Sequence, residues 1–209
     1  LLNFMLIEEP NNKRVWLYLG HQHFAEGNWP KAAEWYLKFS ECADVTPIEK
    51  YQTLTYAARA LRNLGDSRQA IQCDLTALEL YPEWLDAYLG MALNYIPAAN
   101  WDKVIYWAQQ ARTKRAPDRL IFVNPLDATF NVPVTLGQAY IHKQQLQEGL
   151  REYELAQKVR PTDDVAHNIM ALKDAIRRGD IVRGVKAIAL SLLEDKELVK
   201  LRELTKLLP

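Results

Sequence analysis

The sequence has no excess of charge of either sign. Its 26 Lys and Arg residues are balanced by 26 Asp and Glu residues, which gives a formal net charge of zero. Proteins that bind nucleic acids or anionic membranes generally carry a clustered excess of basic residues. We therefore expect no nucleic-acid partner, although a local basic patch is compatible with this composition.

Long apolar runs and cysteines are also scarce. No apolar run approaches the roughly 20 residues that a membrane span requires, and the first residues do not form a signal peptide, so we expect no membrane insertion. Nothing near Cys42 or Cys73 has the spacing of metal ligands. Both cysteines are expected as buried reduced thiols of a cytoplasmic protein, with a disulfide as the alternative. The chain opens at Leu1 inside a helical apolar pattern, which suggests a piece of a longer protein.

Residues that build loops are few as well. The 209 residues include 8 Gly and 10 Pro, and 49% of the chain is apolar. Alternation of apolar and polar residues, which is typical of strands, is hard to find. These features predict an all-α protein with a sizeable continuous core.

A degenerate pattern recurs along this chain. Its first copy has Trp16 and Gly20 in one expected helix and Ala32 and Tyr36 in the next. These positions match the tetratricopeptide pattern, whose period is about 34 residues. The small residue of the pattern recurs at Gly20, Ala58, Ala92, Gly137 and Ala171, in steps of 38, 34, 45 and 34 along the numbering. The closing prolines Pro10, Pro82 and Pro161 follow one another in steps of 72 and 79. The spacing of the small residues and the spacing of the prolines indicate the same two insertions, and a chance match would rarely produce this agreement.

The repeat predicts a right-handed α-solenoid of about five tetratricopeptide (TPR) helix-turn-helix units with a C-terminal capping helix. One helix pair cannot bury its apolar face alone, so neighbouring pairs stack. In the last unit the turn is expected at Gly179–Asp180. We expect the end of a preceding helix at 1–10, a repeat array at 11–178, an insertion near 115–132, and a last helix with a capping helix at 179–209. The units are expected near 13–46, 51–82, 85–117, 130–161 and 164–193.

Part of the sequence resembles the repeat region that follows the catalytic domain in some bacterial and phage family-2 glycosyltransferases. The resemblance covers about residues 1–172 and rests on the segments Pro10–Arg14, Gly27–Trp29 and Asn100–Tyr106, and on the insertion at Ile121–Pro125. It implies an accessory role in a larger glycosyltransferase-type protein, for example in positioning an acceptor. The catalytic domain itself has no match here, because the sequence lacks an Asp-x-Asp motif and a Gly-rich phosphate loop.

No constellation for catalysis or metal binding is visible. His21 and His23 are two apart on an expected helix and point to different sides, whereas helical ligand pairs prefer a spacing of four. We expect no catalytic residue, no cofactor and no metal in this chain, and hence no enzymatic activity of its own. The full-length parent could still be an enzyme.

The expected binding surface is the concave face, which the first helix of each TPR pair lines. Arg59 and Arg62 are three apart and share one helical face, so together with Arg14 they could clamp a carboxylate or phosphate. An ordinary solvated face is the alternative. Leu89 and Leu93 predict either a peptide-anchoring stripe or packing between repeats. The candidate partner-binding residues are Arg14, His21, Thr55, Arg59, Arg62, Asn63, Leu89, Leu93, Gln138, His142 and Asn168.

Two further segments bear on function. The segment Arg115–Asn131 is long for a connector in a repeat array, and such loops are often functional. It either folds over one end of the groove or covers the edge of the third pair. In the tail, Leu198, Leu201, Leu204 and Leu208 form a stripe that suits a cap or a dimerisation face. The sequence therefore predicts a non-catalytic module that binds a peptide or protein segment, with self-association through the groove or the C-terminal helix as the alternative.

Overall fold

The computed structural model describes residues 2–117 and 124–194 of the chain. All regular elements in these ranges are helices, which confirms the all-α prediction. They are α1 (Leu2–Glu8), α2 (Lys13–Ala25), α3 (Trp29–Ser40), α4 (Pro47–Asn63), α5 (Ser67–Leu80), α6 (Leu85–Asn94), α7 (Trp101–Arg112), the π-helical turn η1 (Asp127–Asn131), α8 (Val132–His142), α9 (Leu146–Val159) and α10 (Asp163–Glu194).

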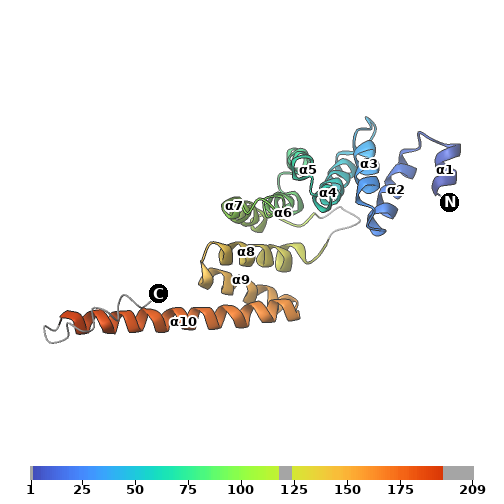
Figure 1. The fold of residues 1–209 in the computed structure, drawn as a ribbon. Helices are drawn as coiled ribbons and strands as arrows, with labels where there is room; N and C mark the ends of the chain where they lie inside the picture. The colour runs from blue at the N-terminus through green and yellow to red at the C-terminus, as the bar shows by residue number, and fades with distance from the viewer. Residues whose placement is uncertain (1, 118–123, 195–209) are drawn as a thin grey trace.

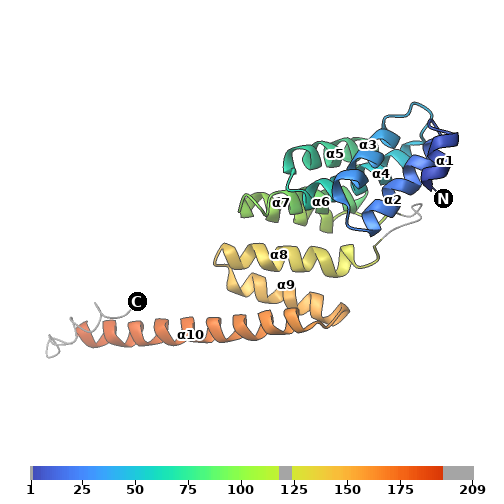
Figure 2. The same ribbon diagram turned by 45° about the vertical axis from the view of Figure 1, so that its right-hand side comes forward.

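The helices stack in chain order and form a solenoid of antiparallel pairs (Figures 1 and 2). The complete pairs are α2 with α3, α4 with α5, α6 with α7, and α8 with α9. Helix α6 also contacts both α4 and α8 across the pairs. The first helices of the second, third and fourth pairs thus touch in sequence, which places them on the inner side of the stack. None of the described helices is both long and apolar enough to cross a membrane.

The turn inside each pair is fixed by local chemistry. A residue with positive φ stands at each of these turns: Gly27 (71°), Gly65 (81°), Ala99 (49°) and Gln144 (60°). This left-handed conformation costs glycine little. In the first three pairs the next residue is Asn or Asp, and its side chain accepts a hydrogen bond from a backbone N–H in the first turn of the second helix. Such caps satisfy donors that the helix itself leaves open.

Close approach within the pairs explains the small residues of the repeat. A Cβ atom added to Gly20 would lie 2.7 Å from the ring of Tyr36, and one added to Gly137 would lie 2.9 Å from the ring of Tyr153. Each glycine therefore makes room for the tyrosine of the second helix. The spacing seen in the sequence reflects this contact.

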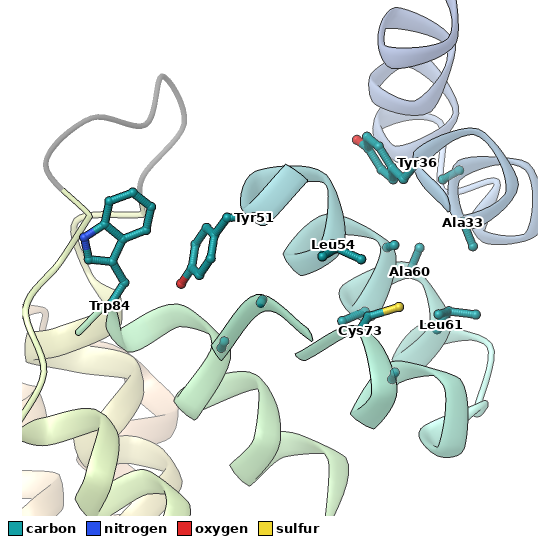
Figure 3. Packing of buried hydrophobic residues seen from close by; sticks show 14 residues of the cluster. Ala33, Tyr36, Tyr51, Leu54, Ala60, Leu61, Cys73 and Trp84 are labelled. Atoms are coloured by element: carbon teal, nitrogen blue, oxygen red, sulfur yellow. The ribbon is translucent and has the colours of Figure 1, made fainter. Parts of the chain in front are cut away.

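The core is continuous across repeat boundaries. In the cluster shared by the first three pairs, Tyr51 of α4 packs edge-on against Trp84, with ring centroids 4.8 Å apart (Figure 3). Trp84 in turn stacks on Tyr81, with centroids 3.9 Å apart. These aromatic side chains fill the space between one pair and the next.

The structure differs from the sequence prediction at the last unit. Helix α10 runs without a break for 32 residues from Asp163 to Glu194, so the predicted turn at Gly179–Asp180 is wrong. No heavy atom lies within 4 Å of a Cβ position at Gly179, so no neighbour forces a turn there and the helix keeps its backbone hydrogen bonds. The expected leucine stripe from Leu198 to Leu208 lies outside the described residues.

Candidate binding groove

The inner side of the stack brings together side chains from three elements. Tyr51 belongs to α4 and Asp86 to the first turn of α6, and the Tyr51 hydroxyl donates to Asp86 Oδ2 at 3.4 Å. The third element is η1, which contacts α6 and α8 and carries Asp127. We call Asp86 and Asp127 the acidic centre of the groove. They are 41 positions apart in the sequence, and the insertion before α8 brings them together.

The electrostatics of the acidic centre reflect burial of both carboxyl groups and the charge of Asp127 acting on Asp86. Burial raises the pKa of Asp86 to about 6, and the nearby negative charge of Asp127 adds to this rise. Burial also raises the pKa of Asp127, while hydrogen bonds from Asn131 and Asn124 and the charge of Arg59 oppose that rise. Two carboxyl groups thus share a poorly solvated place, and Asp86 faces repulsion from its neighbour.

The insertion holds Asp127 through its own hydrogen bonds. The amide of Asn124 donates to Asp127 Oδ1 at 2.8 Å, and its carbonyl oxygen accepts from the backbone N–H of Leu126 at 3.1 Å. On the other side, Phe130 packs in the cluster of the fourth pair. In the described part of this segment, η1 packs on α6, α8 and α9, and the two roles expected for the segment stay predictions.

The predicted arginine clamp is not assembled in the structure. Arg62 Nη1 lies 2.8 Å from Asp74 Oδ2, and Arg14 Nη1 lies 3.0 Å from Glu49 Oε1. The Arg59 guanidinium lies over the Phe24 ring, 5.7 Å from its centroid. Each arginine is thus engaged with a different neighbour rather than converging with the others. Spacing along one helix face could not predict this, because Arg62 and Asp74 lie on the two helices of a pair and meet across its turn.

Several other predicted site residues pack between helices. His21 Nδ1 lies 2.8 Å from the Tyr36 hydroxyl, and burial lowers the pKa of His21, so its imidazole is neutral at pH 7. The Thr55 hydroxyl donates to the backbone oxygen of Gln52 at 2.8 Å. The His21 contact joins α2 to α3, and the Thr55 bond lies within α4.

The predicted apolar stripe lies between repeats. Leu89 is 5% exposed and belongs to the core cluster of the third and fourth pairs, and Leu93 packs against the same cluster. This agrees with the alternative of packing between repeats. His142 stacks on Trp101 with ring centroids 3.9 Å apart. Gln138 and Asn168 are half-buried, and Asn63 is exposed.

The described residues offer no group of three or more His, Cys, Asp or Glu side chains arranged to hold a metal ion. Both cysteines are free thiols, and Cys73 is buried. Burial raises the pKa of Cys73 to about 12.

Neither the protein-family models nor the curated proteins contain a match to this sequence. Solved structures do match. A crystal structure of MamA is 19% identical with a TM-score of 0.58, and covers 75% of this chain and 83% of its own. A thermophilic TPR protein of Thermus thermophilus, TTC0263, is 20% identical with a TM-score of 0.57. The match covers 82% of this chain and 86% of the TTC0263 chain. The structure of MamA from Desulfovibrio magneticus RS-1, residues 41 to the end, is 14% identical with a TM-score of 0.62. The match covers 90% of this chain and 98% of that MamA chain. At these identities the likeness shows the fold, which is the TPR solenoid.

Proposed function

We propose that this TPR solenoid is a non-catalytic interaction module whose concave face binds a polypeptide segment with a basic side chain at the acidic centre. The observation that carries the proposal is the packing of η1 against α6, which brings the half-buried carboxyl groups of Asp127 and Asp86 to the inner side of the stack. In the described part of the chain, no Lys or Arg forms an ion pair with Asp86, and the charge that most affects its pKa is the like charge of Asp127. A cation from a partner would give Asp86 a positive charge, as the charge of Arg59 already acts on Asp127.

The expected energetics favour a single anchoring contact. A charge-assisted hydrogen bond contributes about 1.5–3 kcal/mol in a protein, and an ammonium or guanidinium between two carboxylates can form two of them. The hydroxyl of Tyr51 fixes one carboxylate in place, and the amides of Asn124 and Asn131 fix the other. Such preorganisation lowers the entropy cost of binding.

The test is a peptide-binding measurement with matched acidic variants. A peptide library scanned for Lys and Arg positions would identify a ligand, whose affinity is then measured by calorimetry. Asp86→Asn and Asp127→Asn are each expected to weaken binding about tenfold or more, which is the loss of roughly one charge-assisted contact. Glu79→Gln, at an exposed position of α5, is the control and should leave the affinity unchanged. Binding that is equally strong in all three variants would refute the proposal.

We further propose that the module is an accessory region of a larger glycosyltransferase-type protein. The support is the resemblance of residues 1–172 to the repeat region of family-2 glycosyltransferases. The full-length coding sequence is expected to contain a nucleotide-sugar-binding α/β domain before Leu1. The isolated 209-residue chain is expected to turn over no sugar nucleotide, and hydrolysis by this chain alone would contradict its accessory role.

A further inference from the structure

The second helices of the four complete pairs share one register. The residues 4, 8 and 11 positions after the N-cap residue are buried in all four helices. These positions are Ala32, Tyr36 and Phe39 in α3, Ala70, Asp74 and Ala77 in α5, Val104, Ala108 and Ala111 in α7, and Gly149, Tyr153 and Ala156 in α9. This register marks the face that a second helix presents to its neighbours.

The sequence after Gly179 has the same register. Counted from Asp180 in the same way, positions 4, 8 and 11 are Gly184, Ile188 and Ser191. The segment 181–194 therefore has the pattern of a fifth second helix, although in the structure it continues α10. Figures 1 and 2 show that α10 extends well past α9, so this segment lies away from the pair that it would complete.

The place that a fifth second helix would cover is open. A cavity of about 650 Å³ lies between α9 and α10, and its lining includes Leu150, Lys173, Ile176 and Ile181. Ile181 is 56% exposed. The lining thus mixes apolar side chains with those of Gln147, Lys173, Arg177 and Asp180, next to the point where a TPR chain normally turns back.

The fourth pair shows how a second helix packs over the end of its first helix. Ile141 stands three positions before the turn residue Gln144, as Ile176 stands three positions before Gly179. Ile141 is covered by its second helix, because a Cβ atom added to Gly149 would lie 3.2 Å from Ile141 Cγ1. Gly149 and the glycine at position 184 hold the same place in the shared register. Ile176 is half-buried like Ile141, and a glycine at position 184 is suited to pack against it as Gly149 packs against Ile141.

We infer that a second copy of this chain provides this cover, through reciprocal exchange of the segment 181–194. Ile181, at the start of the segment, lines the cavity of its own chain, and the unbroken helix carries the rest of the segment away from that cavity. Two α10 helices that cross antiparallel near Gly179 place each segment on the partner's cavity. The open space beside Gly179 admits a close neighbour. The interface is closed and twofold, since each copy gives and receives the same element. The acidic centre on α6 and η1 plays no part in this interface.

The first test is the mass of the chain in solution. Light scattering coupled to gel filtration is expected to give twice the chain mass of 24.1 kDa. Ile181→Glu and Ile188→Glu are each expected to give the single-chain mass with an unchanged helical circular-dichroism signal. Met170→Glu is the control, because Met170 is 73% exposed on the same helix and does not line the cavity. A single-chain mass for the unmodified protein, or a dimer that resists both glutamates, would overturn the inference.

The second test separates exchange between copies from folding back within one. In a Cys42→Ser background, Ile176→Cys chains are mixed with Gly184→Cys chains and oxidised. Exchange predicts a disulfide-linked product of two chains that forms in the mixture well above the amount in either variant alone. A double variant that closes its disulfide within single chains, with no linked product in the mixture, would show that the segment folds back on its own chain instead.

Discussion

Asp74 of α5 lies directly against Gly90 of α6, and the missing side chain of this glycine is what admits the carboxylate. A Cβ atom added to Gly90 would lie 2.6 Å from both Asp74 carboxylate oxygens. Asp74 is 1% exposed and accepts hydrogen bonds at 2.8 Å from Arg62 of α4 and from Asn94 of α6. One buried carboxylate thus joins the second pair to the third.

A methyl group at position 90 should break this joint. Gly90→Ala is expected to lower the free energy of unfolding by about 1–3 kcal/mol, as overpacking of a close-packed site does, because the carboxylate has to shift off its two donors. Urea unfolding followed by circular dichroism measures the change. Gln72→Ala, at an exposed position of α5, should change the stability by less than about 0.5 kcal/mol. Equal effects of the two variants would contradict the joint.

Removal of the buried carboxylate should cost more. Asp74→Ala leaves Arg62 with its side chain 16% exposed and its partner gone, and breaking a buried ion pair in this way costs about 3–5 kcal/mol. The matched control is Asp102→Ala, which removes a 79% exposed partner of Lys143 and should cost about 1 kcal/mol or less. The two variants are compared by chemical denaturation at pH 7. A loss for Asp74→Ala no larger than that of the control would show that the pair contributes little.

Asp86 should make the stability of the protein depend on pH. Its pKa is raised to about 6 in the folded chain, above the ordinary value of about 3.9 for an unfolded chain. The folded state therefore holds this proton more tightly, and the resulting stability is present below about pH 4 and lost as the pH rises through about 6.

The variant Asp86→Asn removes this dependence while keeping an oxygen that accepts from Tyr51. Relative to the unmodified chain, it should gain roughly 2 kcal/mol of stability between about pH 4 and pH 7.5. Denaturation curves of both proteins at the two pH values measure the gain. A stability difference between the two proteins that stays constant with pH would contradict the shift.

The two thiols should react very differently. Cys73 is 6% exposed and burial raises its pKa to about 12, whereas Cys42 is half-buried at the end of α3. A thiol reagent at pH 8 is expected to label one cysteine per chain in buffer and two in denaturant, because the thiolate is the reacting species. Mass spectrometry of peptides assigns the labelled residue. Rapid labelling of Cys73 in buffer would show that the second pair opens readily.

Local sequence was enough to predict the repeat itself. Gly20 faces Tyr36 and Gly137 faces Tyr153, and these spacings are visible along the chain because both partners belong to one helix pair. The turn at Gly27 is likewise local, since a residue with positive φ and an adjacent cap are neighbours in the sequence. The all-α solenoid follows from these short-range features.

The groove chemistry was not accessible in the same way. The sequence suggested a basic clamp, but Arg62 is held by Asp74 and Arg14 by Glu49. Their partners lie on other helices, and the distance between two helices depends on how the whole stack is packed. The acidic centre was missed for the same reason, since Asp86 and Asp127 belong to α6 and η1, which meet only in the folded stack.

The helices, their pairing and the small residues that let them approach could thus be derived from the chain alone, because each depends on contacts between segments that are close in the sequence. Which charges meet, and where the last helix ends, depended on the folded chain. Ion pairs form between whichever groups the stacking brings within a few ångströms. A turn at Gly179 would form only where packing against a neighbouring helix stabilised it. In α10 the helix continues, because the described part of the chain places no such neighbour beside Gly179.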